Sequence, residues 1–133
     1  MIREDYVSFE TAKLLKEKGF DVPYYYCSRV YSEHGTLQGV SSVQFPNVKY
    51  ISAPTLQMAM KWLREVHNLH IITIPYAPMD RHPSHHPGEA DVVYIAQLFR
   101  GIIPIDEIGR SIIKLTHEEA CEEAIKYCLE NLI

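Results

Sequence analysis

Three segments of the chain repeat apolar residues at the spacing of an amphipathic helix. The first begins at Ser8, whose hydroxyl can accept a hydrogen bond from an amide of the first turn. Phe9, Ala12 and Leu15 share one face, and Gly19 can adopt the left-handed conformation that ends a helix. The pattern therefore predicts a helix over residues 8–18.

The second helical segment follows Ser52, with Pro54 expected in its first turn. Its apolar stripe comprises Leu56, Ala59, Met60, Leu63 and Val66, with Met58 and Trp62 on one flank.

The third helical segment opens with a capping box, Thr116-His117-Glu118-Glu119. Its inward stripe comprises Ala120, Ala124, Tyr127, Cys128 and Leu132. The carboxylates that follow are expected to be solvated, and Glu122 is placed to pair with Lys126 one turn later.

Aromatic and β-branched runs between these helices indicate strands. Those before the second helix cover residues 24–31, 37–45 and 47–51, and those after it cover 69–76, 91–99 and 111–115. The run at 69–76 is β-branched and largely apolar, which is typical of a central strand. We predict an α+β fold in the order α-β-β-(β)-α-β-β-α. A mostly antiparallel sheet of four to six strands would carry the three helices.

A length of 133 residues predicts a single domain over 1–133, and 47% hydrophobic and 23% charged residues are ordinary globular usage. No run approaches the roughly 20 apolar residues of a membrane span. The N-terminus lacks a signal-peptide pattern, and the three cysteines are odd in number. We therefore expect a cytoplasmic protein with reduced thiols.

The net charge of −4 argues against nucleic-acid binding, which needs a clustered positive field. A weak nucleic-acid-binding module remains an alternative if two basic helix faces lie side by side. The first consists of Lys13, Lys16 and Lys18, and the second of Lys61 and Arg64.

Residues 77–90 hold three prolines without hydrophobic periodicity, which predicts a loop. His82, His85 and His86 lie in this loop beside Asp80 and Glu89, and such groups can bind Zn²⁺ or Ni²⁺. A solvated loop explains the same residues, because no predicted helix or strand orders the ligands. A metal-binding protein or metal-dependent enzyme is thus one alternative, although no cofactor is required by the sequence.

Nine tyrosines are numerous for a chain of this length. In the strand at 24–31, Tyr24 and Tyr26 share a face, and together with Trp62 they are candidates for a protein interface. The competing interpretation is a sheet surface covered by a helix.

The sequence lacks a Gly-rich phosphate loop, a G-x-S-x-G elbow and an H-E-x-x-H helix. Cys121 and Cys128 are spaced as core residues of one helix face, and Cys27 sits in an aromatic strand without a visible base. We therefore expect structural thiols and no catalytic residue.

Three stretches of the chain carry a resemblance. They are EDYVSFETAKLLKEKGF (4–20), SAPTLQ with WLRE (52–57 and 62–65), and THEEA with LENLI (116–120 and 129–133). Together they resemble a group of short uncharacterised proteins of Bacteroides-type gut bacteria and their prophages. The likeness covers the three helices, somewhat under half of the chain. It implies a bacterial or phage setting and no particular chemistry.

These observations favour a non-catalytic accessory protein of a bacterial mobile element. We expect it to act through a protein partner or by self-association.

Overall fold

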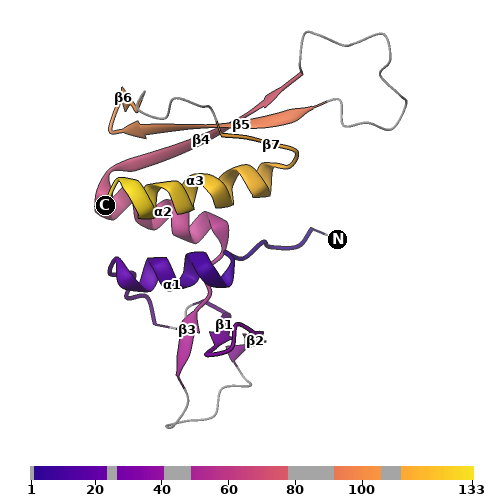
Figure 1. Ribbon diagram of the computed structural model, residues 1–133, viewed down its shortest axis with the longest axis vertical. Coiled ribbons are helices and arrows are strands. Elements are labelled where there is room, and N and C mark those ends of the chain that lie inside the picture. Colours follow the sequence, from indigo (N-terminus) through magenta and orange to yellow (C-terminus); the bar gives the residue numbers. More distant parts are fainter. Residues whose placement is uncertain (1, 24–26, 41–48, 78–91, 106–111) are drawn as a thin grey trace, which may run out of the picture.

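The computed structural model describes residues 2–23, 27–40, 49–77, 92–105 and 112–133 (Figure 1). Within these ranges the helices are α1 (Phe9–Glu17), α2 (Leu56–His67) and α3 (His117–Asn131). The strands are β1 (Arg29–Ser32), β2 (Leu37–Gly39), β3 (Tyr50–Ser52), β4 (Leu69–Tyr76), β5 (Val93–Arg100), β6 (Ile103–Pro104) and β7 (Ile112–Lys114).

The helix boundaries follow from local capping chemistry. Ser8 and Thr116 cap α1 and α3 as the sequence predicts, each side chain accepting a hydrogen bond from the amide three residues later. Gly19 has a φ of +97°, so α1 ends in the left-handed conformation. In α2 the N-cap is Thr55, so Pro54 precedes the cap instead of occupying the first turn.

The strands form two antiparallel sheets, where the sequence suggested one. The smaller sheet has the order β2-β1-β3. In the larger sheet β5 is central: β4 lies along one side of it, while β6 and β7 pair with different parts of its other side. Among the described residues β4 is therefore an edge strand, contrary to the prediction for residues 69–76.

The elements stack in layers (Figure 1). The four-stranded sheet lies at one end, α2 and α3 pack beneath it, α1 lies beyond them, and the small sheet closes the other end. The α+β fold with helices packed on antiparallel sheet is thus confirmed. No helix in the described part of the chain has the length and apolar character needed to cross a membrane.

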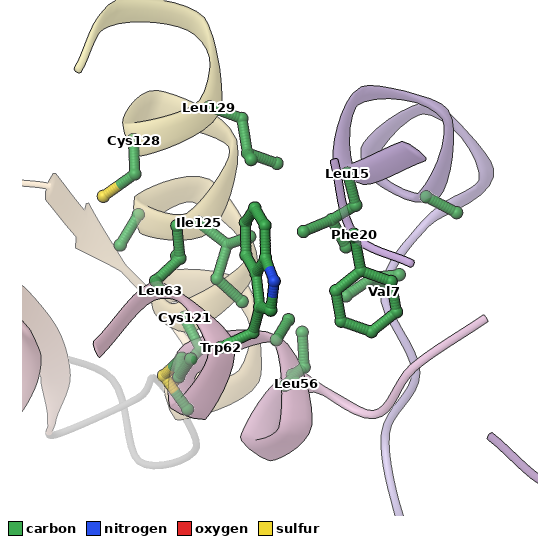
Figure 2. Packing of buried hydrophobic residues seen from close by; sticks show 14 of the residues in the cluster. Val7, Leu15, Phe20, Leu56, Trp62, Leu63, Cys121, Ile125, Cys128 and Leu129 are labelled. Carbon is green, nitrogen blue, oxygen red and sulfur yellow. The ribbon is translucent and has the colours of Figure 1, made fainter. Parts of the chain in front are cut away.

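The core lies between the helices, and Trp62 fills its middle. Figure 2 shows the indole between Leu15 and Phe20 on one side and the α3 residues Ile125 and Leu129 on the other. The Phe20 and Trp62 rings meet edge to face with centroids 5.6 Å apart. Val66, assigned to the apolar stripe from the sequence, is instead 60% exposed. The buried face of α2 is therefore rotated toward Trp62.

A carboxylate joins α3 to the start of α1. Glu122 Oε1 accepts hydrogen bonds from the Ser8 amide at 3.1 Å and from the Thr11 hydroxyl at 2.6 Å. A negative charge at this position also stabilises the positive end of the α1 dipole. Lys126 extends the same contact by an ion pair to Glu10 at 3.1 Å. Glu122 is thus only partly exposed, and the expected Glu122–Lys126 pair is replaced by contacts between helices.

The position of Trp62 predicts a large loss of stability on truncation. Trp62→Ala leaves a cavity between three helices and should lower the free energy of unfolding by about 3–5 kcal/mol in chemical denaturation. Val66→Ala, an exposed change on the same helix, should stay within about 0.5 kcal/mol of wild type. Equal effects of the two substitutions would contradict this packing.

The Glu122 contacts generate a second stability prediction. Glu122→Ala removes a charged acceptor from a fully buried threonine hydroxyl and should cost about 2 kcal/mol. The exposed neighbour Glu123 offers a matched control, since Glu123→Ala leaves that hydroxyl paired. Denaturant midpoints that do not separate the two variants would show that the contact contributes nothing.

Candidate functional site: the outer face of the four-stranded sheet

The residues singled out from the sequence are only partly placed. The metal candidates His82, His85 and His86 and the interface candidates Tyr24 and Tyr26 lie outside the described residues. Among the residues that are described, no three His, Cys, Asp or Glu side chains come together as metal ligands. The metal hypothesis and the tyrosine interface therefore stay predictions.

Trp62 is described, and its side chain is 9% exposed. Besides Phe20 it contacts the His67 ring, with centroids 4.7 Å apart. Its packing accounts for it as a core residue. A surface contact through this indole finds no support in its position.

A polar cluster that the sequence interpretation missed lies where α3 meets β4. His117 Nδ1 is 2.8 Å from the Thr73 hydroxyl, and His117 Nε2 is 3.5 Å from Cys121 Sγ. The Tyr94 ring stands edge-on to the same imidazole. The spacing of His117 and Cys121, four residues apart on a helix, was the available signal for this contact.

His117 and Cys121 are the residue types of a catalytic cysteine–histidine pair, but the surroundings of Cys121 do not suit a nucleophile. Cys121 is 1% exposed, and burial, followed by the nearby Glu118 carboxylate, raises its thiol pKa from 9.0 to about 11. Nucleophilic cysteines need a lowered pKa and access to substrate. Burial likewise raises the pKa of Cys128 to about 12 and raises that of Cys27. The thiols therefore behave as small apolar core groups.

A hollow of about 200 Å³ lies beside His117. Its lining includes Arg3, Asp5, Thr55 and Glu118, which mix both signs of charge. The volume is below the roughly 300 Å³ at which small-molecule sites begin. We assign no ligand to it.

The most distinctive surface is the side of the four-stranded sheet that faces away from α3. Side chains alternate between the two faces of a strand. In β4 and β5, Leu69, Ala96 and Leu98 point toward the helices and are almost completely buried. Their neighbours along each strand point the other way. We call this opposite side the outer sheet face.

Strand register places the residues of the outer sheet face in rows. Each row starts on β4 and crosses to β5, and two of the rows continue to β6 or β7. The rows are Ile74–Ile95–Ile113, Tyr76–Val93, Ile72–Gln97 and His70–Phe99–Pro104.

These rows are largely apolar, with Gln97 and His70 as their polar members, and several of their side chains are open to solvent. Ile72, Ile74, Tyr76 and Ile113 are 48%, 39%, 46% and 53% exposed. Asp, Glu, Lys and Arg do not occur among the described residues of these rows, in a chain with a net charge of −4. Figure 1 shows the described helices on the other side of the sheet only. Within the described ranges, the helices thus leave an uncharged and largely apolar face of the sheet uncovered.

The sequence shows that the strand at 69–76 is apolar, but it does not show which face of the strand is exposed. Residues 69–76 are largely apolar at both odd and even positions, and this run predicted a central strand. The structure buries one face against α3 and leaves the other exposed. Only the packing of the helices decides which side remains open.

Three of the five basic residues of the nucleic-acid alternative have partners of their own. Lys18 donates to the carbonyl of Ile133, Lys13 lies over the Phe9 ring, and Lys61 is 3.9 Å from Glu65. The ammonium groups in these contacts are the ones that would have to bind the phosphates of a nucleic acid. Nucleic-acid binding stays an untested alternative.

The raised thiol pKa values give a pH-dependent prediction. Between pH 9 and about 11, Cys121 stays protonated in the folded protein and ionises in the unfolded chain, so the folded state binds more protons. The contribution of this thiol to the free energy of unfolding should therefore be fully present below pH 9 and be lost as the pH rises from 9 to about 11.

A thiol-reactive probe tests the same environment at neutral pH. The folded protein should react slowly, and denaturant should release all three thiols. Cys121→Ala and Cys128→Ala should each lower the number of thiols released by denaturant from three to two, while native labelling stays slow. Rapid native labelling that Cys121→Ala abolishes would instead identify an accessible nucleophile.

Comparison with known proteins adds no relative to this geometry: no family model, curated protein or solved structure matches the chain. The resemblance of the three helical segments to short Bacteroides-type proteins therefore remains a prediction. The interpretation of the outer sheet face rests on the packing and register of this molecule.

Proposed function

We propose that this protein is a non-catalytic interaction protein that binds another polypeptide through its outer sheet face. The observation that carries the proposal is the exposed row formed by Ile74, Ile95 and Ile113, which crosses three strands without a polar interruption. The setting in a bacterial mobile element follows from the sequence resemblance alone.

The physical support is the cost of leaving such a surface in water. An antiparallel sheet with helices on one side ordinarily alternates apolar-in and polar-out. Here the outward residues include four large apolar side chains that are each at least 39% exposed. With the half-buried Val93, Ile95 and Phe99, the apolar area is on the order of 500 Å². A contiguous patch of this size is typical of a binding surface.

The buried thiols support the non-catalytic part of the proposal. Cys121 has a histidine within 3.5 Å, so it is the described residue best placed to act as a nucleophile. Its burial and its raised pKa keep it as a neutral thiol at physiological pH. A role in packing α3 against β4 accounts for it fully.

A comparison of three baits tests the proposal. Wild-type protein, Ile74→Lys and Val66→Lys are immobilised and exposed to a lysate that also contains untagged copies of the chain. Ile74→Lys places a charge in the middle of the outer sheet face, whereas Val66→Lys alters a position on α2 that is 60% exposed, more than the 39% of Ile74. Binding through the face should be lost with Ile74→Lys and kept with Val66→Lys, because an unpaired charge is costly in an apolar contact.

The bound polypeptides, copies of the chain included, are quantified by mass spectrometry. Circular dichroism melts establish that all three baits are folded. Identical recovery on all three would refute the outer sheet face as a binding surface.

A further inference from the structure

We infer that the polypeptide that covers the outer sheet face is a second copy of this chain, packed face to face about a twofold axis. The inference rests on the proposed function, since it names the partner of the same surface. It makes the four-stranded sheet one half of a two-sheet sandwich, with the helices of each copy on the outside.

Charge is the first argument for a second copy. The described residues of the outer sheet face are neutral apart from the titratable imidazole of His70, which hydrogen-bonds Asn68 at 3.3 Å. A nucleic acid or a strongly charged peptide would find no complementary group there. A second outer sheet face is neutral as well, so self-association buries no unpaired carboxylate or ammonium group from these rows.

Shape is the second argument. Two sheets stack about 10 Å apart when β-branched and aromatic side chains of their facing surfaces interdigitate. The row Ile74–Ile95–Ile113 lies in the middle of the outer sheet face, flanked by Tyr76–Val93 and Ile72–Gln97. A twofold axis through this row would bring isoleucine against isoleucine, an isologous contact in which the same patch serves both copies.

The edge of β4 bears on whether two copies would pack face to face or pair strand to strand. Pro75 lies within β4 opposite Tyr94 and brings no N–H to either side of the strand. A proline is accommodated in a ladder when its nitrogen points away from the paired strand, and it weakens that edge for a further strand. At the β4 edge, Pro75 therefore favours association through the exposed side chains over addition of another strand.

Area sets the expected strength. Each copy would contribute on the order of 500 Å² of apolar surface, or about 1,000 Å² for the pair, which is the lower limit of a specific interface. We therefore expect a reversible dimer with a dissociation constant in the micromolar range. Because the two copies carry the same net charge and a neutral contact, added salt should not weaken it.

The test measures mass and affinity on the purified whole chain by sedimentation equilibrium and light scattering over a concentration series. The wild-type mass should rise toward twice the 15.4 kDa of one chain. It should do so equally in dilute buffer and in about 0.5 M NaCl. Ile74→Lys should raise the dissociation constant at least about 100-fold, because it introduces a charge from each copy into the contact.

Two further variants control for misfolding and for a general effect of an added lysine. Ile113→Lys changes the far end of the same row at a 53% exposed position and should also give monomers. Val66→Lys lies on α2, away from the outer sheet face, and should dimerise like wild type. Melting curves identify any variant that fails to fold.

The outcomes separate the inference from the proposed function. A wild-type protein that stays monomeric at the highest concentration, or a dimer that persists in both isoleucine variants, would overturn the second-copy inference. In either case the immobilised-bait comparison still decides whether a different polypeptide binds through Ile74. Binding that is lost there with Ile74→Lys would sustain the docking surface with another partner.

Discussion

Burial of α3 on several sides is the constraint on which the rest of the molecule depends. This helix contacts β4, β5 and β7 on one side and α1 and α2 on the other. Its buried positions include Ala120, Ala124 and Cys121, whose small side chains let neighbouring elements approach closely. Larger residues there would push the layers apart, because protein interiors are packed too densely to absorb added volume. The thiols of Cys121 and Cys128 are part of this close packing, which explains why their pKa values are raised.

The polar groups of α3 also follow from this position. Glu122 would be solvated on an isolated helix, but α1 lies close enough for its carboxylate to accept two hydrogen bonds at the start of that helix. His117 turns toward Thr73 for the same reason, since β4 runs beside the first turn of α3. In both places a tertiary contact converts a surface residue into a connector between elements. The short distance between His117 and Cys121 resembles that of a catalytic pair. The burial of Cys121 distinguishes it from one.

The helical layer covers one side of the four-stranded sheet, and this one-sided cover produces the functional hypothesis. All described helices lie between the two sheets (Figure 1). The apolar character of β4 and β5 would suit a sheet covered on both faces, whereas the part of the chain that the structure describes covers only one of them. An intermolecular contact that completes a sandwich would cover the other. It does so without requiring any charged or catalytic group on that face.

Local chemistry along the chain determined the helices and most strand positions. Ser8, Gly19 and Thr116 mark helix ends through capping interactions that span a few residues, so they could be recognised without a fold. The division into two sheets, the edge position of β4 and the burial of Trp62 in place of Val66 could not be recognised in this way. Each depends on which distant elements pack together, because apolar side chains are drawn to any buried surface and do not specify their partner. The uncovered face was likewise encoded as an apolar strand, and only the one-sided packing of α2 and α3 turned it into a surface.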